Sequence, residues 1–155
     1  MLRAAAAFFL MAFVALPVFS AHAAEKPPKA LVEELSKKAH DAFISVKNPE
    51  GQPIVKPEDA KKLKYPLTGY DEREMAVARG YLSGYAKWCG LKWQKDFFAP
   101  YVVALKKEHG KKWTPFQYAY TEMLHGLSMA VAEGTKKGQT CTAAEKTRLS
   151  ALAKK

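Results

Sequence analysis

The sequence predicts an all-α protein, a small bundle of four main helices with short additional helical pieces, closed by one disulfide between Cys89 and Cys141. Three observations support this prediction. Apolar residues recur three and four positions apart in several segments, which is the spacing of one helix face. Strong helix-start signals stand at Thr114 and Thr142. No segment alternates apolar and polar residues over the length of a strand.

Residues 1–23 have the pattern of a cleaved signal peptide. Arg3 supplies a positive charge, an apolar run follows, and Ala21 and Ala23 are the small residues of a cleavage site. The apolar run is short for a spanning helix, which needs roughly 20 residues, so an uncleaved anchor is the weaker alternative. We therefore expect a periplasmic or secreted protein, cleaved after Ala23, with a single helical domain over residues 24–155 and no transmembrane segment after cleavage.

The composition is strongly basic. The formal net charge is +10, and removing Arg3 with the leader leaves 24 basic against 15 acidic side chains, a charge of +9. The basic residues are mostly lysines scattered along the chain, whereas nucleic-acid readers favour clustered arginine. We therefore expect no nucleic-acid partner. A solvated surface is the simplest interpretation, and attraction to anionic lipid head groups, an anionic envelope component or an acidic protein is the alternative.

Cys89 and Cys141 are the only cysteines. An even number in an exported chain favours a disulfide, and this one would close a loop of roughly 50 residues. A reactive thiol or a thiolate metal ligand is the alternative, although the chain has no C-x-x-C motif.

The first helix is expected over residues 29–47, where Asn48-Pro49 ends it. Its apolar stripe consists of Leu31, Leu35, Ala39, Ala42 and Val46. A long proline-rich connection follows over about residues 49–68, with one helical turn beginning at Pro57. Such a connection can pack as an arm or act as a lid.

A second helix is expected over residues 71–89, with Asp71 and Glu74 as a capping box and Gly90 as its stop. Its apolar stripe is Met75, Ala78, Leu82, Tyr85 and Cys89. A separate row of small residues, Ala76, Gly80 and Gly84, either lets another helix approach closely or leaves bare backbone for a ligand.

Three further helices are expected over residues 92–109, 115–134 and 143–153. Pro100 should kink or split the first of these, and Trp113 and Tyr118 have the spacing of a hydrophobic staple. The core candidates are Phe97, Phe98, Tyr101, Val102 and Leu105, and then Phe116, Tyr120, Met123, Leu127 and Val131. An antiparallel arrangement brings Cys89 and Cys141 to one end of the bundle, in agreement with the disulfide.

A second, polar stripe on residues 115–134 includes Glu122, His125 and Met129. We expect His125 to be an interface histidine bonded to a neighbour such as Glu122. Copper or zinc bound by His125, Met129 and Glu122 is an alternative, because imidazole and thioether ligands suit copper. One histidine and one methionine supply only half of the ligands that a metal site needs, so no cofactor is predicted.

Catalytic signatures are scarce. The segment Gly80-Tyr-Leu-Ser-Gly84 is one residue out of step with a nucleophile elbow and falls inside a predicted helix. We therefore favour a binding role over an enzyme, with an active site assembled from distant residues as the alternative. The predicted groove lies beside the second and fourth helices and contains Gly80, Tyr81, Gly84, Tyr85, Glu122, His125 and Met129.

Each tryptophan follows a lysine, at Trp88, Trp93 and Trp113. Such pairs suit a membrane interface or an anionic polymer, but Trp113 is expected at the opposite end from the other two, so one shared patch is not expected.

The segment from Gly80 to Met123, with GYLSGY, a lysine-rich helix end and a further helix, resembles small helical periplasmic immunity proteins that block secreted amidase effectors. The resemblance covers about a third of the chain and implies an inhibitory protein–protein role. It assigns no residue. The sequence thus predicts an exported, non-catalytic binding or interaction module for a protein partner, an envelope component or a small ligand.

Overall fold

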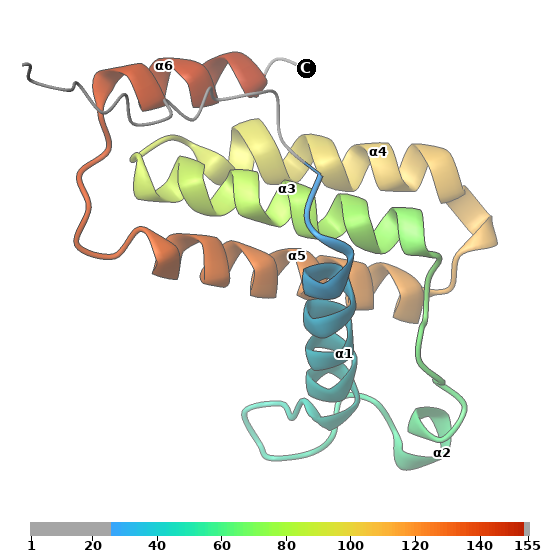
Figure 1. Ribbon diagram of the computed structural model, residues 1–155. Coiled ribbons are helices and arrows are strands. Elements are labelled where there is room, and N and C mark those ends of the chain that lie inside the picture. Colours follow the sequence, from blue (N-terminus) through green and yellow to red (C-terminus); the bar gives the residue numbers. More distant parts are fainter. Residues whose placement is uncertain (1–25, 154–155) are drawn as a thin grey trace, which may run out of the picture.

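A computed structural model describes residues 26–153, and this part of the chain is helical without a β-strand, so the all-α prediction is confirmed (Figure 1). The predicted signal peptide and its cleavage site lie outside the described residues. The elements are α1 (Lys29–Ser45), α2 (Pro57–Ala60), α3 (Tyr70–Trp88), a π-helical turn η1 (Gln94–Phe98), α4 (Ala99–His109), a 3₁₀ turn η2 (Gly110–Lys112), α5 (Pro115–Thr135) and α6 (Ala143–Leu152).

The centre of the fold is a layer of three long segments in which α3 lies between α4 and α5 (Figure 1). The most extensive packing joins α3 to α5. Helix α1 crosses this pair and packs against both helices, whereas α6 lies over the end of the layer where α3 stops (Figure 1). Within residues 26–153, no helix combines the length and the apolar composition that crossing a bilayer requires.

The start signals of α5 and α6 are confirmed. Thr114 Oγ1 accepts a hydrogen bond from the Gln117 backbone N–H, and Gln117 Oε1 accepts one from the Thr114 N–H at 2.9 Å. Thr142 and Glu145 form the same reciprocal pair at the start of α6. The rings of Trp113 and Tyr118 lie 5.2 Å apart, as expected of a staple.

The capping box predicted for the second helix is wrong. Helix α3 begins at Tyr70, and Gly69 occupies the N-cap position without a side-chain hydrogen bond. Glycine tolerates the extended N-cap conformation, so the helix can begin earlier than Asp71. Asp71 then falls in the first turn, where its charge still interacts favourably with the helix dipole.

The third predicted helix is not split at Pro100, because the helical backbone continues from Trp93 through a π-helical turn into an α-helix. The chain makes the π-helical turn η1 and then enters α4, with Pro100 in the first turn of that helix. In an α-helix the ring of a proline meets the carbonyl group of the preceding turn, and the wider π-helical turn before Pro100 relieves this contact.

The predicted buried faces of α3 and α5 need correction. In α3 the buried residues are mostly small, whereas Met75, predicted to be in the core, is 43% exposed. In α5 the buried residues are Tyr120, Thr121, Leu124, His125, Ser128 and Ala132. Of the predicted stripe, Phe116, Met123, Leu127 and Val131 are only half-buried. The two helices lie so close together that small side chains occupy the interface, and the larger ones border it.

Cys89 and Cys141 form the predicted disulfide, with their Cα atoms 5.1 Å apart. It joins the end of α3 to the segment that precedes α6. Around it lies a second, smaller core that contains Ala86, Phe97 and Leu149. The disulfide therefore holds α6 on the end of the three-helix layer.

The long connection between α1 and α3 packs as an arm. Val55 is 2% exposed, and Pro57 begins the predicted helical turn. Near its end, the Tyr65 hydroxyl donates a hydrogen bond to Glu33 at 2.6 Å, and the buried Arg73 guanidinium donates to the same carboxylate oxygen at 2.7 Å. Burial and the Glu33 carboxylate raise the pKa of Tyr65 to about 12. This network ties the connection to both α1 and α3.

Candidate functional site

The two glycines of the predicted groove lie in the contact between α3 and α5. A Cβ atom added to Gly80 would lie 2.5 Å from the His125 carbonyl oxygen and 2.6 Å from Ser128 Cβ. A Cβ atom on Gly84 would collide with the Met129 carbonyl oxygen and lie 2.8 Å from Ala132 Cβ. The small-residue row therefore serves close helix packing, the first of the two interpretations of this row, and the backbone there is covered by α5.

Replacing Gly84 with alanine should lower the free energy of unfolding by about 2 kcal/mol, the usual cost of forcing an extra methyl group into a packed contact. The matched control is Gly126→Ala on α5, where an added Cβ meets nothing within 4 Å. That control should stabilise the protein by up to about 1 kcal/mol, because alanine is the better helix former. Urea unfolding gives the free energy of unfolding of both variants. If both substitutions changed it in the same direction, Gly84 would not lie in a close helix contact.

His125 is enclosed between three helical segments. It is 1% exposed, and its Nε2 atom is hydrogen-bonded to Ser83 Oγ at 2.9 Å. Its ring stacks on Tyr101, with ring centres 5.3 Å apart, and contacts Phe98 at 4.9 Å. Burial lowers the pKa of His125 to about 4, although hydrogen bonding with the Arg79 backbone acts in the opposite direction. His125 is thus neutral at neutral pH.

The structure corrects the hydrogen-bond partner expected for His125. Glu122 was expected, but the bond is made with Ser83 on the neighbouring helix. Glu122 is half-buried, and its charge helps to raise the pKa of the nearby Tyr101 hydroxyl, for which burial is the main cause. The histidine is therefore an interface residue, as expected, with a different partner.

Ser83 and His125 are as close together as a nucleophile and its general base, but a substrate cannot reach them. Ser83 is fully buried, and His125 is nearly so. A substrate carbonyl must reach the serine oxygen, and here the stacked rings of Phe98 and Tyr101 and the α3–α5 contact surround the pair. The pair therefore satisfies two buried polar groups and gives no support to acyl-transfer chemistry.

The metal alternative also lacks a ligand set. Among residues 26–153, no three His, Cys, Asp or Glu side chains are grouped so that they could hold an ion. His125 Nε2 already has Ser83 as its partner. His40, on α1, bonds through Nε2 to the Leu63 carbonyl oxygen at 2.8 Å and so adds no ligand near His125.

The remaining predicted groove residues lie on two different sides of the α3–α5 pair. Tyr81 lies toward α1, where Glu34 contributes to its raised pKa, although burial is the main cause. Tyr85 follows Tyr81 at helical spacing, with ring centres 6.0 Å apart, and Lys136 lies 5.5 Å from its ring centre. Glu122 and His125 instead lie toward Tyr101 of α4. Met129, one turn after His125, shares that side. These residues therefore do not line one groove.

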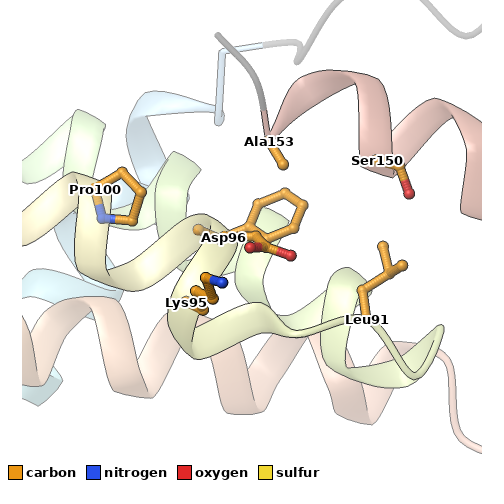
Figure 2. A pocket seen from close by; sticks show the side chains of 7 residues that line it. Leu91, Lys95, Asp96, Pro100, Ser150 and Ala153 are labelled. Atoms are coloured by element: carbon orange, nitrogen blue, oxygen red, sulfur yellow. The ribbon is translucent and has the colours of Figure 1, made fainter.

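A surface recess lies elsewhere, between η1, the start of α4 and α6, and we call it the α6 recess (Figure 2). It has a volume of about 370 Å³ and is lined by Leu91, Lys95, Asp96, Phe97, Pro100, Ser150 and Ala153. Figure 2 shows Ser150 on α6 and Ala153 just after its last residue, across from Lys95, Asp96 and Leu91. A second shallow recess, lined by residues 91–95, adjoins it and shares Leu91 and Lys95.

The α6 recess was not among the predicted sites. Its residues come from two segments about fifty positions apart, and none belongs to a recognised motif. The available signals were indirect: the disulfide that anchors α6 and the Lys92-Trp93 pair beside the recess. The chain matches no protein-family model, and comparisons with curated proteins and with solved structures also give no match.

Proposed function

We propose that the protein is an exported, non-catalytic binding module and that its ligand occupies the α6 recess. The observation that carries the proposal is the contrast in access between the two regions. Ser83 and His125 are packed inside the helical layer, whereas the α6 recess is open and has both apolar and charged lining residues. Residues 1–23, with their signal-peptide pattern, support export.

The lining of the α6 recess suits a ligand with an apolar part and a negative charge. Phe97, Leu91 and Pro100 supply apolar surface, which favours an aliphatic or aromatic group. Lys95 lines the recess, and Lys92 lines the adjoining one, so an anionic group is attracted. Asp96 is the carboxylate of the lining and disfavours a dianion there. The terminal carboxylate and last apolar side chain of a peptide have this chemistry.

The proposal is tested by amide NMR titration with acetyl-phenylalanine as the probe and its carboxamide as the uncharged comparison. We expect the carboxylate to shift the amide signals of Leu91, Phe97 and Ala153, and the carboxamide to bind more weakly. Ser150→Tyr should fill the recess and abolish the shifts. Ser45→Tyr, at an exposed serine of α1, is the matched control and should leave the shifts intact.

Two outcomes would reject the proposed site: shifts that cluster elsewhere, or shifts that survive Ser150→Tyr unchanged. The export part is separate. Protein recovered from the exported fraction should begin at Ala24, because cleavage is expected after Ala23. A mature chain that retains Met1 would reject export with cleavage and leave the recess proposal standing.

A further inference from the structure

We infer that the outer face of α4 docks on the surface of an anionic lipid bilayer. This inference goes beyond the proposed function, because it concerns a helix face that adjoins the α6 recess, shares only Pro100 with it and needs no ligand in it. Helix α4 lies on the side of α3 away from α1, and so its outer face is free of that helix (Figure 1). We call the exposed residues Ala99, Pro100, Val103, Ala104, Lys106 and Lys107 the α4 face.

The α4 face presents apolar atoms to solvent. Helix α4 buries Tyr101 and Leu105 in the core. Its opposite side exposes Ala99, Pro100 and Ala104, and Val103 is 66% exposed. Val103 is the most exposed large hydrophobic side chain among residues 26–153. Ala99, Pro100, Val103 and Ala104 thus form a short apolar strip on the exposed side of α4, of a kind that a bilayer interface accepts.

Lysines flank this apolar strip at both ends. Lys106 and Lys107 lie in the last turn of α4, and Lys111 and Lys112 follow the sharp turn at Gly110. Lys92 and Lys95 precede the strip. All six are exposed, and none is among the ion pairs of the described part of the chain. Their charges are therefore free to interact with an external anion.

Few carboxylates oppose these lysines. Residues 97–107 contain no Asp or Glu. Asp96, before the strip, lines the α6 recess beside Lys95. Glu108 is exposed in the last turn; at about 100° per residue it lies roughly 140° from Val103 and 40° from Ala104, so it borders the α4 face at one edge. The balance of charge around the α4 face is thus clearly positive.

The combination favours a lipid surface over a soluble polyanion. A polyanion would need the lysines alone, whereas a bilayer interface also accepts Pro100 and Val103 among the upper acyl chains. Helix α4 has 11 residues, a length of about 16 Å, so it fits lying in the plane of the interface.

The experiment is co-sedimentation of the mature protein with phosphatidylcholine vesicles that either contain or lack phosphatidylglycerol. We expect binding to the anionic vesicles only, weakened by added salt. Lys106→Gln with Lys107→Gln should weaken binding about thirtyfold, the fold-change that corresponds to about 1 kcal/mol for each lysine. The matched control is Lys37→Gln with Lys38→Gln, an exposed lysine pair on α1, which should reduce binding far less.

A second pair of variants isolates the apolar contribution. Val103→Ser should weaken vesicle binding several-fold, and Ile54→Ser, at a 60% exposed isoleucine of the arm, should have little effect. Loss of binding in the lysine variant but not in Val103→Ser would overturn the insertion of the apolar strip and leave only electrostatic attraction to the lipid head groups. Dimerisation that depends on Val103, or equal binding to neutral vesicles, would also overturn it. Ser150→Tyr, which tests the recess, should bind vesicles like the wild type, so the two proposals can fail separately.

Discussion

Replacing Cys89 and Cys141 with alanine should lower the free energy of unfolding by about 4 kcal/mol. The two cysteines are 52 positions apart, and opening a loop of that length restores about this much conformational free energy to the unfolded chain. Domains of this size are usually stable by about 5–15 kcal/mol, so the loss is a large part of the total. Cys89 is also buried in the second core, where its loss removes apolar contacts.

The measurement is urea unfolding of the oxidised wild type, the reduced wild type and the double variant. The reduced protein and the variant should unfold at similar urea concentrations, well below the oxidised protein. Reductant should not change the variant, which is the control for side effects of the reagent. If reductant left the wild-type midpoint unchanged, the disulfide would not contribute as described.

The loss should be felt first in α6. This helix is docked mainly through Leu149, which is 1% exposed in the second core, and through the disulfide just before its N-terminus. Without the disulfide, the amides of α6 should exchange with solvent faster than those of α3 and α5. Because Ser150 and Ala153 line the α6 recess, the double variant should also lose affinity for a ligand bound there.

The features predicted correctly from the sequence depend on short segments. The caps at Thr114 and Thr142 and the turn at Gly90, which has φ of +68°, each follow from a few adjacent residues. The even number of cysteines in a chain with a signal-peptide pattern predicts the disulfide, and the expected antiparallel arrangement agrees with it. Each of these follows from local backbone chemistry or simple topology.

The choice of buried face could not be read in the same way. Large apolar residues usually mark the core, and this rule places Met75 inside. The α3–α5 contact instead selects Gly80, Gly84 and Ala132, because the closeness of the two backbones leaves no room for larger side chains. Hydrophobicity alone does not report how close two helices will come, so the small-residue row was the better signal.

The candidate site could be predicted least. Ser83 and His125 are 42 positions apart, and their hydrogen bond exists only after α3 and α5 pack. The same holds for the α6 recess, whose two segments meet when α6 docks on η1. The sequence singled out His125 as a chemically notable residue, but its exposure, and with it its role, is set by tertiary packing with Phe98 and Tyr101.

The buried His125 should make the protein less stable as the pH falls from about 6.5 to about 4. Its pKa in the folded state is about 4, below the usual value of 6.5 that it regains on unfolding. In this window the unfolded chain binds a proton that the folded chain does not, so acid favours unfolding. The contribution of the neutral His125 to the free energy of unfolding is fully present above about pH 6.5. Near pH 4 the free energy of unfolding is lower by about 3 kcal/mol on account of this residue.

The prediction is tested with urea unfolding across this pH range and with calorimetric measurement of proton uptake. Near pH 5.3 the unfolding of the wild type should take up about 0.9 proton at His125. His125→Phe keeps a ring between Phe98 and Tyr101 and should remove this uptake. Carboxylates with lowered pKa values, such as Glu33 beside Arg73, also favour unfolding in acid, but mainly near and below their usual pKa of 4.5. Equal pH slopes for wild type and variant between pH 5 and 6.5 would show that the imidazole is solvated, and the enclosed position derived for His125 would then be wrong.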